Sequence, residues 1–137
     1  MESLLIGMMV YYFFALFCLM IYMFLKRRKA IQEKKLSFGY FKDYQGDIPD
    51  NLKIIENHYN NQFQIPLLFF VACLLALQQD SVDLFVLICA GLFIISRFIH
   101  SYIHLGSNHL LKRALVFFWG VVFTFGIFLR VFYLSFI

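Results

Sequence analysis

The chain has 137 residues, of which 62% are hydrophobic and only 15% are charged. Soluble globular domains are nearer half apolar and a quarter charged, so this chain has too little polar surface to cover a water-soluble globule. Its net charge of +4 comes from basic residues that border apolar runs, without the basic and aromatic pattern of a nucleic-acid-binding motif. We therefore predict a membrane protein with no nucleic-acid partner.

Four apolar runs are long enough to cross a bilayer, which takes about 20 residues at ~1.5 Å rise per residue. In chain order they cover about residues 4–25, 61–79, 84–105 and 114–137. We predict an all-α, integral membrane four-helix bundle that forms a single domain in contact with membrane lipid. Three cysteines lie inside these runs without metal-ligand or disulfide spacing, so we expect buried free thiols at Cys18, Cys73 and Cys89.

The second run needs a polar extension before it. Pro49 suits the first turn of a helix that begins near Asp47 and enters the membrane at about Asn61. Pro66 lies inside the same helix and has no backbone N–H, so we predict a kink there that neighbouring helices must cover.

The basic residues predict the orientation. Ten of the twelve Lys and Arg residues lie in 26–53 or at Lys112 and Arg113, which are the first and third connections. By the positive-inside rule these connections face the cytoplasm, which places both termini on the non-cytoplasmic side. The other two bases lie within spans, and we interpret Arg130 as snorkelling or structural.

Polar side chains inside the spans are costly in lipid, and here they form two stripes at helical spacing. Both stripes lie in the predicted cytoplasmic half, where Arg113 stands at the entrance of the fourth helix. They can converge on a pocket suited to a small anionic, amide-rich ligand, or they can simply join helices by hydrogen bonds. The first stripe comprises Asn57, Asn61 and Gln64, and the second comprises Arg97, His100 and His104.

The pair His100 and His104 has the spacing with which one helix face can ligate a metal, and His109 could join it. No nearby carboxylate or second such pair accompanies it, so we predict no metal site. The sequence also has no Gly-rich phosphate loop, nucleophile elbow or paired-carboxylate motif.

The chain resembles the MAPEG family, the membrane-associated proteins in eicosanoid and glutathione metabolism, which includes microsomal glutathione transferases and prostaglandin E synthase. The resemblance covers essentially the whole chain. It is clearest in Asn61-Gln62-Phe63-Gln64-Ile65-Pro66 and in Arg97-x-x-His100-x-x-x-His104-x-Gly106 followed by Lys112-Arg113.

The resemblance implies a homotrimer of four-helix subunits that binds glutathione between neighbouring subunits near the cytoplasmic face. Carried over, Asn61 binds the glutathione peptide, His100 and His104 line the site, and Arg113 stabilises the thiolate. This chain has Asn57 and Gln64 where the family has an Arg and a Glu. His104 also replaces the usual Tyr, and Ala114 stands where one member has a Ser.

The leading hypothesis is a glutathione-dependent transferase or peroxidase for lipophilic electrophiles, with Arg113 as the catalytic residue and glutathione as the cofactor. Residues Asn57, Asn61, Gln64, Arg97, His100 and His104 would bind it. The alternative is a non-catalytic scaffold of the same fold that binds a lipid or a partner protein. A channel is a third class, but it would carry polar residues through the full bilayer depth, and the outer halves here are apolar apart from Arg130.

Overall fold

The computed structural model describes residues 1–136, which form helices and no strand. Four segments are long and apolar enough to cross a membrane, namely α1, α3 together with α4, α5, and α6. The prediction of an all-helical protein with four helices long and apolar enough to span a membrane is therefore confirmed over residues 1–136. The predicted end of the last span, residue 137, lies outside the described residues. The helices are α1 (Glu2–Gln32), α2 (Tyr40–Asp43), α3 (Asp50–Asn61), α4 (Ile65–Gln78), α5 (Leu84–Leu105) and α6 (Leu110–Leu134).

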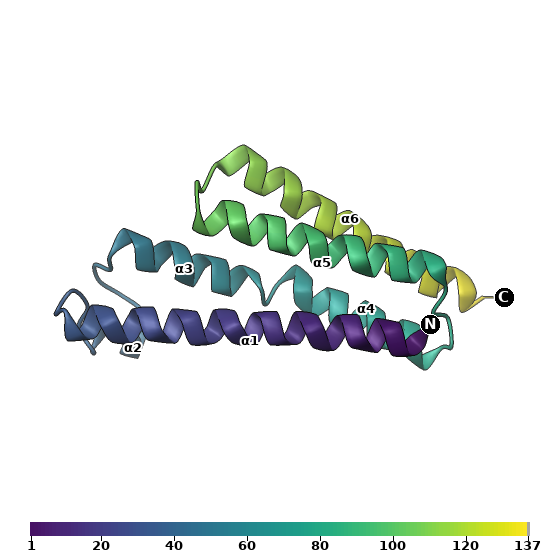
Figure 1. Cartoon of the computed structure of the whole chain (residues 1–137), viewed down its shortest axis with the longest axis horizontal. Coiled ribbons are helices and arrows are strands. Elements are labelled where there is room, and N and C mark those ends of the chain that lie inside the picture. The colour runs from purple at the N-terminus through teal and green to yellow at the C-terminus, as the bar shows by residue number, and fades with distance from the viewer. Residues whose placement is uncertain (137) are drawn as a thin grey trace.

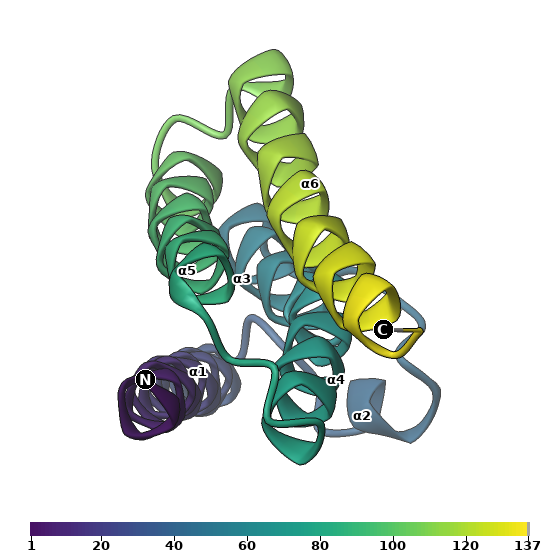
Figure 2. The same ribbon diagram turned by 90° about the vertical axis from the view of Figure 1, so that its right-hand side faces the viewer.

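The long helices run side by side along one axis (Figure 1). Helix α1 packs against α3, α4 and α5, while α6 packs against α4 and α5 on the other side of the bundle (Figure 2). The start of α1, the end of α6 and the α4–α5 connection lie at one end, and the α1–α3 and α5–α6 connections lie at the other (Figure 1). The two connections that carry most of the basic residues therefore share one end of the molecule.

That shared end is predicted to face the cytoplasm, and labelling tests the prediction. Ser37 and Ser107 are exposed, so a cysteine at either position should react with an impermeant maleimide only from the cytoplasmic side. A cysteine at exposed Asp80, in the α4–α5 connection, is the control and should react only from outside. Labelling of position 37 or 107 in intact cells would reverse the assigned orientation.

The apolar core lies where α1, α4 and α5 meet. Phe69 and Phe93 stack with ring centroids 4.0 Å apart, and Tyr12 of α1 packs edge-on against both rings. Small buried residues such as Ala72 and Ala90 let the helix backbones approach closely, as is common in membrane bundles. The three cysteines are free, and two of them are buried as expected, whereas Cys18 is exposed on the outer face of α1.

The second span is broken rather than kinked. Helix α3 begins at Asp50 with Pro49 as its N-cap residue and ends at Asn61, and α4 begins at Ile65. Pro66 therefore occupies the first turn of a new helix, where its missing N–H leaves no hydrogen bond unmade. The amides of Gln62 and Phe63 instead make tighter bonds, to the carbonyls of Tyr59 and Asn60.

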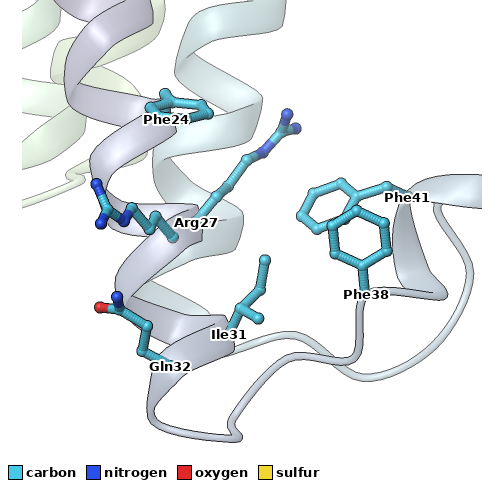
Figure 3. Close-up of a pocket in the computed structure, with 7 residues that line it drawn as sticks. Phe24, Arg27, Ile31, Gln32, Phe38 and Phe41 are labelled. Carbon is cyan, nitrogen blue, oxygen red and sulfur yellow. The ribbon is translucent and has the colours of Figure 1, made fainter.

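The first connection folds back onto the end of α1. Its residues Leu36 and Tyr40 form a small second core with Ala30 and Leu52. Beside this core lies a groove of about 430 Å³. Figure 3 shows Phe38 and Phe41 of the connection facing the α1 side chains across this groove. The basic end of the bundle is thus a packed lobe.

At the opposite end, Asp83 fastens α5 to α6. Its carboxylate accepts the Val86 amide at the start of α5 (2.9 Å) and pairs with the Arg130 guanidinium of α6 (2.7 Å). Arg130 is therefore structural, one of the two roles predicted for it. Burial opposes ionisation of Asp83, but the amide and the guanidinium outweigh it and hold the pKa of this carboxyl below its ordinary value.

This lowered pKa makes a pH prediction. A carboxyl with a lower pKa in the folded state stabilises the protein above its unfolded pKa, and that stabilisation is lost as the pH falls through the folded pKa. The pair is partly exposed, so we expect it to contribute under about 1 kcal/mol at pH 7. Asp83→Asn keeps a capping oxygen but not the charge. The unfolding midpoint of this variant should lie below that of the wild type at pH 7, and the two should converge as the pH falls below the lowered pKa of Asp83, whereas a constant difference would contradict this.

Candidate functional site

A layer of buried polar side chains crosses the bundle towards the end that carries the α5–α6 connection. Helix α5 is unbroken, so the spacing of Arg97, His100 and His104 places all three on its inner face, and all three are almost completely buried. The structure therefore brings the predicted second stripe together.

Arg97 holds a positive charge in the interior, and no carboxylate of residues 1–136 pairs with it. Its Nη2 donates to the carbonyls of Val116 (3.4 Å) and Phe117 (3.2 Å) on α6, and its guanidinium lies over the rings of Phe93 and Phe117. Its Nε and Nη1 are buried and have no hydrogen-bond partner among the described residues. Unpaired donors on a buried cation are costly, so this side chain is suited to receive an anion.

Gly120 of α6 makes the space for this guanidinium. A Cβ built on Gly120 would lie 2.9 Å from Arg97 Cζ and closer still to Nη2, which is inside van der Waals contact. The backbone of α6 can therefore approach the Arg97 guanidinium this closely only because Gly120 has no side chain.

A directed chain of hydrogen bonds links α1, α3 and α5. The Tyr12 hydroxyl donates to Gln62 Oε1 (2.9 Å), which turns the Gln62 amide nitrogen towards His58 Nε2 (3.2 Å). Because His58 accepts at Nε2, its proton sits on Nδ1, and this atom lies 3.1 Å from Nδ1 of His104. Tyr12, Gln62, His58 and His104 thus form one interior network.

His100 completes a cluster with His58 and His104. Its Nδ1 lies 3.3 Å from the backbone carbonyl of Arg113, and a carbonyl can only accept. The His100 proton is therefore on Nδ1, and its Nε2 is a buried lone pair without a partner among residues 1–136. Over the same described residues, these three histidines are the only group with metal-ligand spacing.

Arg113 stands at the edge of this layer, in the first turn of α6. Its side chain is half-buried, and its Nη1 donates to Asn108 Oδ1 (2.7 Å) in the α5–α6 connection. Its backbone contacts His100, but its guanidinium forms no ion pair among the described residues. Lys112 beside it is exposed.

The first predicted stripe does not join the buried layer. Asn57 and Gln64 are exposed and Asn61 is half-buried, so these residues lie on the outer surface of a single chain. Gln64 also lies in the break between α3 and α4, where helical spacing no longer holds. His109 is exposed and stands apart from the histidine cluster.

The sequence predictions omitted two buried polar residues, His58 of α3 and Gln62 immediately after its end. They are four residues apart and continue the apolar face that begins with Leu52 and Ile55, all of which are buried. Extending that apolar face by steps of three and four would have selected His58 and Gln62 over Asn57 and Asn61.

Two cavities border the network. One, of about 130 Å³, lies between α1, α3 and α5 and is lined in part by Tyr12, His58 and Arg97. The other is a lateral groove of about 460 Å³ between α1 and the α3–α4 break, lined by aromatic and aliphatic side chains. Gln62 borders both cavities, so the groove meets the polar network at this side chain.

The part of the chain that matches a known protein family includes nearly all of the helices described above. The model of the MAPEG family matches residues 9–133, from the first span to the end of α6. Among the curated proteins and the solved structures that were compared, none matches the chain.

Proposed function

Because the chain belongs to the MAPEG family, we propose that it is a membrane-embedded, glutathione-dependent transferase or peroxidase for lipophilic electrophiles. The observation that carries the proposal is which arginines of the chain pair with a carboxylate and which do not. Of the four arginines that are not exposed, Arg27 and Arg130 pair with carboxylates, whereas Arg97 and Arg113 do not within residues 1–136. Both lie in the half of the α5–α6 pair that is nearer to the α5–α6 connection. Glutathione carries two carboxylates and an ionisable thiol, which are the groups that unpaired guanidinium groups bind.

In this proposal Arg113 acts on the thiol. A guanidinium beside a thiol lowers the thiol pKa and favours the nucleophilic thiolate, and Arg113 is accessible enough to reach a bound ligand. Its position in the first turn of α6 adds the partial positive charge of a helix N-terminus. The buried His100 contacts the Arg113 carbonyl, so its role is to position the start of α6.

The tripeptide itself requires a second copy of the chain. The small cavity beside Arg97 has about 130 Å³, room for about four waters at ~30 Å³ each, which is enough for one carboxylate of glutathione but too little for the whole tripeptide. Asn57, Asn61 and Gln64 present amides on the outer surface, and lipid would leave the amides of Asn61 and Gln64 unpaired within the span. A homotrimer that covers this surface would join the amides of one subunit to the arginines of its neighbour.

The lipophilic substrate would reach the site by a separate route, through the lateral groove. The lateral groove is lined by Phe13, Phe17 and Phe70 among others and opens on the outer face of the bundle. Apolar walls of this kind suit an acyl chain or an aromatic electrophile that enters from the membrane.

Kinetics of two neighbouring variants test the proposal. We expect Arg113→Ala to reduce glutathione conjugation of chloronitrobenzene, or reduction of a lipid hydroperoxide, by about 10²-fold or more while changing glutathione affinity much less. The reason is that the lost guanidinium serves the thiolate rather than the thiol. Lys112→Ala removes an equal charge from the exposed side of the same turn and should change little. The proposal fails if the wild type has no turnover with either class, or if the two variants behave alike.

The second candidate function is a non-catalytic scaffold that binds a lipid. The observation that favours it is the lateral groove, which accommodates an acyl chain without any glutathione. If the wild type neither binds nor turns over glutathione but retains a co-purified phospholipid, the result would favour this lipid-binding function.

A further inference from the structure

We propose that His58, His100 and His104 form a transition-metal site that joins α3 to α5, which goes beyond the glutathione chemistry and does not depend on it. One nitrogen of each ring lies within 4.8 Å of the others. Tetrahedral zinc with Zn–N bonds of ~2.05 Å holds its ligand nitrogens about 3.3 Å apart. The 3.1 Å between the Nδ1 atoms of His58 and His104 is already close to that separation.

His100 supplies a ligand in the correct tautomer. Its Nδ1–H is held by the Arg113 carbonyl, the contact that orients most metal-binding histidines from behind. Its Nε2 lone pair is buried and has no partner among the described residues. A buried lone pair without a donor is unfavourable, and a metal ion would satisfy it.

The His58 and His104 rings can also become metal ligands after small changes in hydrogen bonding. Metal binding at His58 Nδ1 leaves the ring proton on Nε2. Once the Gln62 amide has turned over, His58 Nε2–H donates a hydrogen bond to Gln62 Oε1, and the Gln62 amide nitrogen donates to the Tyr12 oxygen. His100 and His104 are one turn apart on α5, the spacing at which a helix presents two ligands to one ion.

The ligand set selects the kind of metal. Three neutral imidazoles without a carboxylate or thiolate suit zinc, copper or nickel rather than magnesium or calcium. Three protein ligands leave a fourth position, and the 130 Å³ cavity that His58 lines has room for a water or a small anion there. The same cavity is lined by Arg97, so we expect an anionic fourth ligand that offsets the positive charge of the guanidinium.

The test uses the full chain without a histidine tag, purified in detergent and in buffer free of thiols. Equilibrium dialysis against Zn²⁺ should give about one bound zinc per chain, and Co²⁺ should give the visible absorption of a four-coordinate site. His58→Gln and His104→Gln keep side chains that can form hydrogen bonds but are poor zinc ligands. We expect each to weaken zinc binding by about tenfold or more. His109→Gln removes the exposed histidine outside the cluster and should bind as the wild type does.

A second measurement covers the case in which a glutamine variant does not fold. Zinc should raise the unfolding midpoint of the wild type, and a chelator should reverse the shift. The proposal is overturned if the wild type shows neither stoichiometric zinc nor this shift, or if His109→Gln loses binding while the cluster variants keep it. Because no glutathione is present, these results are independent of whether the protein is a glutathione enzyme.

Discussion

Replacement of Glu56 with alanine is expected to release the first connection from the bundle. The buried Glu56 carboxylate accepts Arg27 Nε of α1 (2.8 Å) and the Tyr40 hydroxyl of α2 (2.9 Å), so one side chain of α3 holds both elements. Removal of one partner of a buried ion pair costs about 3–5 kcal/mol because the other charge is left unpaired. Arg27 retains some exposure to solvent, which reduces the expected cost to about 2 kcal/mol.

Limited proteolysis measures this effect. If cleavage after Lys42 requires local opening of the lobe, a loss of about 2 kcal/mol should speed it by about 30-fold. Glu33→Ala is the matched control, because the pairs of Glu33 with Lys29 and Lys35 are exposed and contribute little. Glu56→Gln keeps an acceptor for Tyr40 and should fall between the two. Equal cleavage of Glu56→Ala and Glu33→Ala would show that the buried pair does not hold the lobe.

Gly120→Ala is expected to destabilise the protein more than Gly126→Ala, although both substitutions add one methyl group. The Cβ of Gly120→Ala would enter the space of the Arg97 guanidinium, which Phe93 and Phe117 prevent from swinging aside. Overpacking of this kind costs about 1–3 kcal/mol. At Gly126 the nearest atom is Cys89 Sγ at 3.4 Å, an ordinary contact.

The control substitution therefore has the opposite expected sign. Alanine favours a helix over glycine by up to about 1 kcal/mol, so Gly126→Ala should be neutral or stabilising. Thermal unfolding in the same detergent compares the two variants directly. An unfolding midpoint of Gly120→Ala at or above that of Gly126→Ala would mean that Arg97 is not confined as described.

The helices were predictable because hydropathy and length are properties of a local run of sequence. The face of α5 was predictable for the same reason, since Arg97, His100 and His104 lie on one unbroken helix. The break between α3 and α4 was not, because the chemistry of Pro66 predicts a lost hydrogen bond but not how many residues leave the helix. Gln64 lies in that break, so it does not continue the helix face of Asn57 and Asn61.

The partners across helices were the other unpredicted part. Glu56 and Arg27 are 29 residues apart, and no helical periodicity relates them. The contact between His58 and His104 spans 46 residues in the same way. Both depend on how α1 and α5 pack against α3, which requires the assembled bundle.

Calorimetry with reduced glutathione tests the central claim most directly, because every step of the proposed glutathione chemistry depends on binding of the tripeptide, to which Arg97 is expected to contribute a charged contact. Titration of the purified protein in detergent should give saturable heat with wild type, and Arg97→Leu should weaken glutathione binding by about tenfold or more, since a charge-assisted contact contributes about 1.5–3 kcal/mol. Leucine fills much of the buried volume without placing a charge there. Absence of saturable heat with wild type at millimolar glutathione would contradict the account and leave a lipid-binding scaffold as the function of this bundle.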